Sequence, residues 1–500
     1  MNFFSFFLKK KVPTRTTIRS LITAPLSWLG VVLIGLLIAI AVMIYILLIK
    51  LNDRIMVTIP AHGGTLTEGV IGAPHLINPI LAQTETDVEL ATLMYVGLVA
   101  ENADGSFSPV LADHYEISPD NRTYTFTLRK KLQFHDKKPL TSADVAYTFG
   151  KVANTTINPG GADYWHNITV STSDTSTISF TLPEPRNDFL AHATVGILPA
   201  HIWQDVPDEL FDTAPENTAP VGAGAFAFKK LVEHDGIPEE IILSHNAHFA
   251  LGKPYLDELR IAFYANQQDL TAAIEAGDAD FSFALQSSSA ATLAVEGFDV
   301  EQISTGDTIG LFGLDGSSHL DASVLKILNS SIDMAHILAI VEHGYGIAPS
   351  ILGDTPDTET TLASLTTIGY TQQDGTLQKK GIPVSTSIAV ENDPNILSVA
   401  HALGDELGTL GIGTLVAAFD PGTFARGLAT HEYTTILATD DSVPSSYKLI
   451  LPLYTPVIPY IGDERVHIPT LSPSPRLRYG DARNWYTRTD RVWTWFTKKQ

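Results

Sequence analysis

Residues 109–149 read PVLADHYEISPDNRTYTFTLRKKLQFHDKKPLTSADVAYTF and contain two hydrophobic periodicities. Residues 123–128, TYTFTL, place an apolar side chain at every second position with threonine between them, which is the pattern of a strand with one buried face. Thr141 and Asp144 then form the pattern of a capping box ahead of Val145, which predicts the start of a helix. The segment therefore predicts a fold that contains both strands and helices.

The same two periods recur on either side of this segment. Residues 86–98 repeat apolar side chains at helical spacing, whereas residues 178–182 alternate like a strand. Residues 321–343 and 394–410 predict two further helices, the second capped by Asp393. Strands and helices mix without strict alternation, and 500 residues exceed the size that one hydrophobic core fills. We therefore expect at least two mixed α/β lobes.

An uncharged apolar segment lies near the N-terminus. Residues 26–49 read LSWLGVVLIGLLIAIAVMIYILLI, and at about 1.5 Å per residue such a helix crosses a hydrocarbon layer of ~30 Å. Most nearby basic residues precede it, so the N-terminus is expected in the cytoplasm and the main body outside the cell membrane. A cleaved signal peptide is the alternative, but its apolar region is usually shorter and residues 59–61, IPA, make a poor cleavage site. We expect a cytoplasmic segment over 1–25, a single transmembrane anchor over 26–49 and a tether over 50–62.

Composition excludes several classes of function. The formal net charge is −23 although the segment before residue 55 is basic, so the body is acidic and would repel nucleic acid. Cysteine is absent, which excludes disulfides, thiolate metal sites, a cysteine nucleophile and a lipidated N-terminal cysteine. The sixteen histidines form no HExxH motif, and no GxSxG elbow occurs. No cofactor or metal is expected and an enzyme is not favoured, although a Ser-His-Asp triad stays open because its members need not be adjacent.

The block over residues 109–149 resembles the signature of the family 5 solute-binding proteins, which are the dipeptide- and oligopeptide-binding receptors of ABC importers. Other segments resemble this family in the same order along the chain. They are Asn78-Pro79, residues 95–99 (YVGLV), 198–201 (LPAH), 221–226 (VGAGAF), 254–257 (PYLD), 277–280 (GDAD), 332–333 (ID) and 451–454 (LPLY).

This resemblance implies a two-lobed α/β fold of the class II periplasmic-binding-protein type, with an extra subdomain on lobe I and one transmembrane helix before it. We expect lobe I with its subdomain over residues 63–285 and lobe II over 286–447. Residues 448–500 are then expected to return to lobe I and to form the C-terminal tail.

The resemblance also implies a function without catalysis. A membrane-anchored receptor of this kind binds a peptide, or another small solute, between its lobes and delivers it to an ABC transporter permease. Backbone hydrogen bonds to an extended peptide supply affinity without demanding a particular sequence. Ligand contacts that form only in the closed state shift a hinge equilibrium between the lobes.

Four residues are candidates for ligand contacts. In peptide-binding members an aspartate near a D-x-x-D-P or similar segment pairs with the ligand's α-ammonium group, and by spacing to the proline Asp440 matches best, with Asp441 next. The alternative for both is an ordinary turn, since Asp, Ser and Pro are common turn residues. Trp165 and neighbouring Tyr164 are expected to line the cleft, although an aromatic pair also suits core packing.

The sequence departs from the family near its C-terminal end. Only residues 442–450 separate the aspartate pair from the strand at 451–454, where the family usually has a much longer helical segment. Lobe II is therefore expected to be shortened beside the cleft. This leaves an alternative function, an interaction protein of the cell envelope that keeps the receptor fold but has lost ligand transport. A hydrolase on the same scaffold is a third, weaker alternative.

Overall fold

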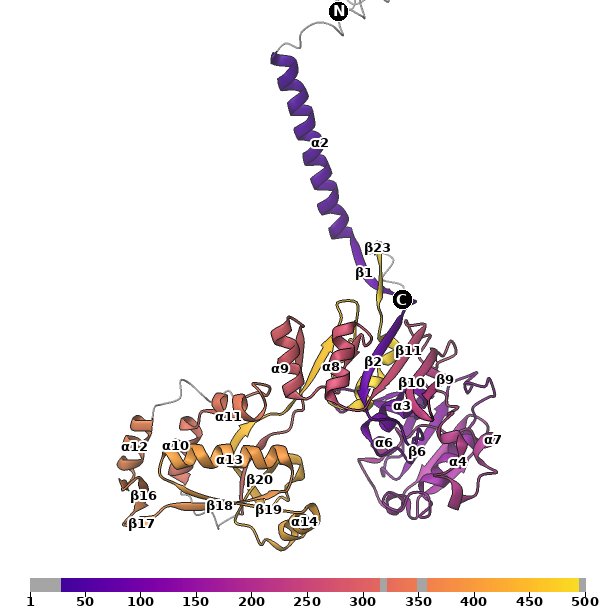
Figure 1. The fold of residues 1–500 in the computed structure, drawn as a ribbon. Helices are drawn as coiled ribbons and strands as arrows, with labels where there is room; N and C mark the ends of the chain where they lie inside the picture. Colours follow the sequence, from indigo (N-terminus) through magenta and orange to yellow (C-terminus); the bar gives the residue numbers. More distant parts are fainter. Residues whose placement is uncertain (1–27, 315–321, 349–357, 494–500) are drawn as a thin grey trace, which may run out of the picture. The chain divides into compact units, whose positions relative to one another are not determined.

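The computed structural model describes residues 28–314, 322–348 and 358–493. The chain divides into two compact units, the first made of residues 1–60 with 489–500 and the second of residues 61–488 (Figure 1). Each unit is described in turn.

The first unit is a long apolar helix followed by a short β-ribbon. Helix α2 (Trp28–Ile55) contains Gly30–Leu47, which has a mean hydropathy of 3.0 and is long and apolar enough to cross a membrane. The helix leads directly into β1 (Met56–Ala61), which pairs with β23 (Arg488–Trp493) (Figure 1). Residues 50–62, predicted as a tether, are thus mostly helix and paired strand. The predicted segment 1–25 and the first two residues of the predicted span lie outside the described residues.

The second unit opens with a seven-stranded mixed sheet, the centre of the first lobe. Strand β2 is parallel to both of its neighbours, β11 and β12, whereas the outer pairs are antiparallel. The order is β13 (Val300–Ser304), β22 (Val457–Gly462), β12 (Phe281–Ser282), β2 (Thr65–Ile71), β11 (Glu258–Tyr264), β10 (Ile237–His245) and β9 (Phe226–His234). Its helices are α3 (Glu85–Met94), α8 (Gln267–Ala276), α9 (Ser287–Glu296) and α15 (Pro475–Gly480). Strand β22 therefore brings the C-terminal part of the chain back into this sheet, between β12 and the edge strand β13.

A four-stranded antiparallel sheet forms a subdomain of the first lobe. Its order is β5 (Ala112–Ile117), β6 (Thr123–Leu128), β8 (Thr177–Thr181) and β7 (Thr169–Thr172). The short hairpin β3 (Val99–Glu101) and β4 (Phe107–Pro109) precedes it, and helices α4 (Ser142–Val152), α5 (Ala162–Trp165), α6 (Phe189–His192) and α7 (Ala200–Trp203) accompany it. The predicted strand over 123–128 and the helix after Thr141 are both confirmed, and the Asp144 carboxylate accepts the Thr141 N–H at 2.9 Å.

The second lobe is built on a five-stranded sheet with a separate hydrophobic core. The order is β19 (Gly413–Phe419), β18 (Ser385–Glu391), β20 (Thr435–Thr439), β14 (Ile309–Leu314) and β21 (Tyr447–Tyr454). Its helices are α10 (Ala322–Ser331), α11 (Met334–Val341), α12 (Thr358–Thr367), α13 (Pro394–Thr409) and α14 (Pro421–Thr430), and a small sheet joins β15 (Tyr370–Gln373), β16 (Thr376–Lys379) and β17 (Ile382–Pro383). The predicted apolar face of α13 is confirmed, since Leu403 and Leu407 are fully buried.

Two details differ from the sequence prediction. Residues 321–343 form two helices rather than one, because Asp333 caps α11 by accepting the His336 N–H at 3.0 Å, and the axes bend by 61° there. The chain also passes from one lobe to the other later than predicted in both places. Strand β13 still belongs to the sheet of the first lobe, and β21 still belongs to the sheet of the second. The two crossings are residues 305–308 and 455–456, and the Thr305 N–H donates to the Pro456 carbonyl at 3.0 Å.

Candidate functional site

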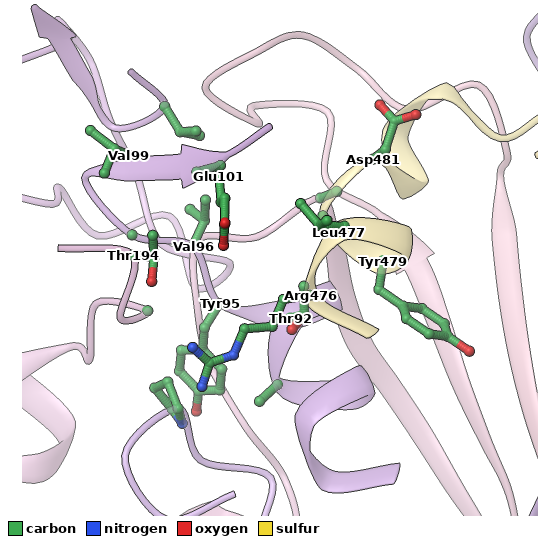
Figure 2. A pocket seen from close by; sticks show the side chains of 18 of the residues that line it. Thr92, Tyr95, Val96, Val99, Glu101, Thr194, Arg476, Leu477, Tyr479 and Asp481 are labelled. Atoms are coloured by element: carbon green, nitrogen blue, oxygen red, sulfur yellow. The ribbon is translucent and has the colours of Figure 1, made fainter. Parts of the chain in front are cut away.

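The first lobe contains a cavity of about 500 Å³ between α3, the β3–β4 hairpin and α15. Figure 2 shows the side chains that line it. Val96, Val99 and Leu477 contribute apolar surface to the wall. A cavity of this size, with apolar walls and a few polar groups, suits a small organic ligand.

Four charged side chains line this cavity: Glu101, Arg476, Asp481 and Arg483. Arg476 extends from α15 and Glu101 from β3, and both are exposed (Figure 2). Within the described part of the chain neither side chain forms a hydrogen bond or an ion pair. Arg483 Nη1 donates to the Leu251 carbonyl at 2.5 Å, and Asp481 Oδ2 accepts the Thr470 hydroxyl at 2.7 Å. Arg476 and Glu101 are therefore the charged groups that remain available to a ligand.

A buried arginine fixes α15, the helix that carries Arg476. Arg478 is fully buried, and its Nη2 lies 3.3 Å from Glu85 Oε1 and 3.5 Å from Glu89 Oε1 on α3. Its guanidinium carbon lies 4.2 Å from the centre of the Phe283 ring, and its Nη1 donates to the Ser472 carbonyl at 2.9 Å. Charge-assisted hydrogen bonds of this kind hold α15 firmly against α3.

The same buried cluster contains a carboxyl group with a strongly shifted pKa. Glu68 on β2 is buried and accepts a hydrogen bond from the Tyr479 hydroxyl. Burial raises the pKa of Glu68 to about 8, against the opposing effects of Tyr479 and Arg478. Burial, together with the nearby Glu68 and Glu85, raises the pKa of Glu89 as well. Protons in this cluster therefore stay bound at pH values where an exposed glutamate is ionised.

Asp440, the first predicted ligand residue, lies on the second lobe at the end of β20. The side chain is exposed, and its Oδ1 accepts the Thr308 N–H at 2.8 Å while the Asp440 N–H donates to the Thr308 carbonyl at 3.0 Å. Thr308 belongs to one of the two crossings between the lobes. Asp440 thus lies beside a hinge candidate, and its role toward a ligand stays a prediction. The side chain of Asp441 lies outside the described residues.

The predicted aromatic pair lies in the subdomain and does not contribute to the lining of the 500 Å³ cavity. Trp165 is 5% exposed, and its ring packs on Phe149 with centroids 4.8 Å apart. Tyr164 stacks on His192 at 3.5 Å and donates its hydroxyl to Asp188 at 3.1 Å. This placement agrees with the core-packing alternative for Trp165, and the ligand role of the pair stays a prediction.

Sequence reasoning missed the charged residues of the first lobe. Arg476 and Arg478 lie in a C-terminal segment that carries no motif, and the partners of Arg478 are almost four hundred residues earlier in the chain. The acidic residues of α3 were visible only as members of a helical segment. Over the described ranges, no group of three or more His, Cys, Asp or Glu side chains could hold a metal ion.

A family model supports the resemblance that the sequence suggested. The model described as bacterial extracellular solute-binding proteins, family 5 Middle, matches residues 106–438, a range that runs from the subdomain into the second sheet. This match confirms the predicted family.

Curated relatives match shorter stretches. A Brucella ovis protein named as an ABC transporter peptide-binding protein is 33% identical over 176 residues, which are 35% of this chain and 32% of the relative. The oligopeptide-binding protein AppA of Bacillus subtilis is 26% identical over 226 residues, 44% of this chain and 41% of the relative. The matched part thus spans less than half the length of these relatives.

Solved structures extend the likeness over a larger share of the chain. HbpA2 from Haemophilus parasuis superposes with a TM-score of 0.67 at 17% identity, covering 85% of this chain and all of that structure. At this identity the likeness concerns the fold alone. The predicted two-lobed binding-protein fold is confirmed.

Proposed function

Because this chain belongs to the bacterial extracellular solute-binding proteins of family 5, we propose that it is the membrane-anchored, extracytoplasmic substrate-binding protein of an ABC importer. Its ligand is a peptide, or a similar small solute, held in a cleft between the two lobes. The observation that carries the proposal is the family match over residues 106–438, because it includes elements of both sheets and one of the two crossings between them.

Peptide binding suits the chemistry of the described residues. The relatives from Brucella ovis and Bacillus subtilis are named for peptide and oligopeptide binding. Asp440, with Asp441 next to it, is proposed to pair with the ligand's α-ammonium group, because an exposed carboxylate at a strand end can approach a cation directly. Once the cleft excludes water, each peptide N–H and C=O group needs a partner, so backbone groups of the protein supply affinity.

The two crossings supply the hinge for closure. They are short, they are tied to each other by the Thr305–Pro456 hydrogen bond, and Asp440 binds Thr308 in one of them. A ligand cation at Asp440 would therefore act beside the segment whose backbone angles change during closure. Closure follows if the ligand contacts both lobes only in the closed state.

The apolar helix α2 is proposed to stay as an uncleaved anchor, with the basic segment before it in the cytoplasm. Anchoring keeps the receptor in the membrane plane, where it meets its ABC transporter permease by two-dimensional diffusion. Delivery of ligand to the permease requires no covalent chemistry, and no catalytic role is proposed for this chain.

A second candidate function has one specific observation in its favour. Only η3 (Asp440–Ser442) and a short loop separate β20 from β21, so the second lobe lacks the long helical segment expected of the family at this point. An envelope interaction protein that has kept the fold but lost ligand transport would tolerate such a loss.

Native mass spectrometry of the full chain, released from detergent micelles after expression in a bacterial host, separates these functions. We expect a heterogeneous set of small peptide masses on the wild-type protein and their loss in Asp440→Ala. Asp299→Ala, which removes an exposed carboxylate of the first lobe, is the matched control and should keep the peptides. A clean apo mass that also gains nothing from an added peptide mixture would contradict the importer and favour the second candidate.

A further inference from the structure

The second lobe touches the first at a place other than the two crossings. The segment that follows α11, residues 342–347, is called the latch here. The side chain of Tyr345 in the latch is 8% exposed and packs in a hydrophobic cluster of the first lobe, with Leu270 of α8, Leu293 of α9 and Ile461 of β22. No other described residue between β14 and β21 belongs to this cluster. The second lobe thus inserts one aromatic ring into the first.

A carboxylate of the latch accepts hydrogen bonds from both lobes. Ser287, the first residue of α9, donates its hydroxyl to Glu342 Oε2 at 3.0 Å. Tyr454, the last residue of β21, donates its hydroxyl to Glu342 Oε1 at 3.0 Å. Hydrogen bonds to an ionised acceptor are stronger than those between neutral groups. Glu342 therefore joins a helix of the first lobe to the sheet of the second.

The backbone of the latch runs along one of the crossings. Ile347 and Thr455 exchange two N–H···O=C bonds, both of 2.9 Å, and the Gly346 N–H donates to Gln302 Oε1 on β13 at 3.3 Å. Gly346 has a φ of +139°, and a Cβ atom there would lie 2.6 Å from Leu338 Cδ2, so this turn needs glycine. The path of the latch is therefore fixed by pairing and by close packing.

The crossings alone would leave the second lobe free to twist. Residues 305–308 and 455–456 are joined by the hydrogen bond between Thr305 and Pro456, so together they make one narrow connection. A few backbone angles in such a connection absorb both bending and twisting of one lobe against the other. The latch adds contacts at a second place, on α8 and α9. Contacts at two places leave rotation about one axis only.

We infer that the latch is a pivot, which holds the ligand-free lobes in one relative orientation and confines their closure to rotation about one axis. The inference goes beyond the proposed function, because it concerns the protein without a ligand and holds for any ligand of the cleft. The apparent affinity of a ligand rises with the fraction of the protein that can already close on it. A pivot increases this fraction because it removes orientations in which the lobes do not meet.

Distances between two spin labels test the pivot in the full chain, held in lipid nanodiscs without ligand. The chain contains no cysteine, so Lys230→Cys on β9 and Ala425→Cys on α14, both at exposed positions, put one label on each lobe. We expect one narrow distribution of distances by pulsed electron paramagnetic resonance. Tyr345→Ala should broaden it about twofold because twisting becomes possible, whereas Tyr345→Phe keeps the ring and should leave it narrow.

Tyr433→Ala is the matched control, because Tyr433 is a buried tyrosine of the second lobe that packs on Phe424, outside the latch. It should keep the narrow distribution, and unfolding curves verify that each variant folds. If Tyr345→Ala does not fold, Ser287→Ala combined with Glu342→Gln takes its place, because it weakens the latch without emptying a core position. A distribution that is already broad in the wild type, or that stays narrow in the variant that weakens the latch, would overturn the inference.

Isothermal titration with the tripeptide Ala-Ala-Leu separates the pivot from the proposed function. The wild type should bind this peptide several-fold more tightly than Tyr345→Ala, since fewer molecules of the variant are oriented for closure. Equal affinities would contradict this effect of the pivot on binding. A wild type that binds no peptide would contradict the importer, but the narrow distribution and its broadening in Tyr345→Ala would still support the pivot.

Discussion

The two lobes differ most in what their interiors contain. The described part of the second lobe buries no charged side chain, and its buried polar residues are all threonines. The first lobe buries several ionisable groups. They are Glu68, Asp87, Glu89, Asp144 and Arg478. Because a buried ionisable group needs hydrogen-bonding partners at defined positions, the interior of the first lobe tolerates fewer arrangements of side chains than the interior of the second.

The lobes also differ in the space that they offer to a ligand. The first lobe has the cavity of about 500 Å³, whereas a much smaller pocket of about 30 Å³ lies in the second lobe between α12 and α13. The shortened connection between β20 and β21 also falls in the second lobe. Under the proposed function, we expect the first lobe to supply most of the ligand contacts, and the second lobe to supply the moving surface together with Asp440.

The largest expected effect concerns the aromatic core of the subdomain. Trp165→Ala should lower the free energy of unfolding of the first lobe by about 3–5 kcal/mol, because it leaves a cavity beside Phe149 and Phe180. Denaturant titration, monitored by hydrogen exchange of the amides in β6 and β8, measures this loss of stability. Leu415→Ala, at a side chain that is 66% exposed on β19, should change stability by less than about 0.5 kcal/mol. A small effect of Trp165→Ala would contradict a role for Trp165 in packing the core of the subdomain.

A smaller loss is expected at the start of α4. Asp144 is buried, and its carboxylate accepts the N–H groups of Thr141 at 2.9 Å and Ala200 at 3.1 Å. Asp144→Ala leaves both N–H donors without this partner and should lower the free energy of unfolding by about 2 kcal/mol. Thermal or denaturant unfolding measures this loss. Asp144→Asn keeps one acceptor and should lose less. Equal losses in the two variants would contradict a hydrogen-bonding role.

The dependence of stability on pH should belong to the first lobe. The pKa of Glu68 is raised to about 8 by burial, so the folded protein keeps this proton at pH values where the unfolded chain has lost it. Its contribution is full below the unfolded pKa and is lost as the pH rises toward 8. The slope is at most about 1.4 kcal/mol per pH unit for one proton.

Glu68→Gln should therefore flatten the decline in first-lobe stability between pH 5 and 8, measured by denaturant titration at several pH values. Exchange of second-lobe amides, after correction for the intrinsic rate, should show a smaller slope, because no carboxyl group is buried in the described part of that lobe and, among its carboxyl groups, only the partly buried Glu406 has a raised pKa. The same slope in wild type and Glu68→Gln would contradict a bound proton at Glu68.

The smallest effect on stability is expected at Asp440. The asparagine of Asp440→Asn can still accept the Thr308 N–H, and the side chain is exposed. The free energy of unfolding should therefore change by less than about 1 kcal/mol. Loss of peptide binding without loss of stability in this variant would support contact with the ligand's ammonium group. A strongly destabilised variant would instead indicate that Asp440 mainly holds the crossing at residues 305–308.

Local structure was predictable where local signals determine it. The alternation in residues 123–128 and the cap at Thr141 gave a strand and a helix, because side chains within a few residues determine them. The break between α10 and α11 was missed, although Asp333 is a good capping residue, because the apolar spacing continues through it. The lobe boundaries were predicted too early because strand pairing, rather than composition, assigns β13 and β21 to their sheets.

The candidate site was less predictable. Asp440 was predicted from its spacing to a proline. Arg476 and Glu101 line the same cavity although they are far apart in the sequence, so no local pattern indicates them. The partners of Arg478 illustrate the same limit, since nothing near Glu85 or Glu89 indicates a cation from the C-terminal segment. Such pairs depend on how the C-terminal segment packs on α3, which one sequence does not show.

Hydrogen exchange of the full chain in nanodiscs, with and without saturating Ala-Ala-Leu, tests most directly whether the first lobe supplies the ligand chemistry. The account predicts protection of amides in α3, the β3–β4 hairpin and α15, which surround the cavity, and weaker protection around Asp440 on the second lobe. Peptide binding that protects only the second lobe, and leaves α15 unchanged, would contradict it.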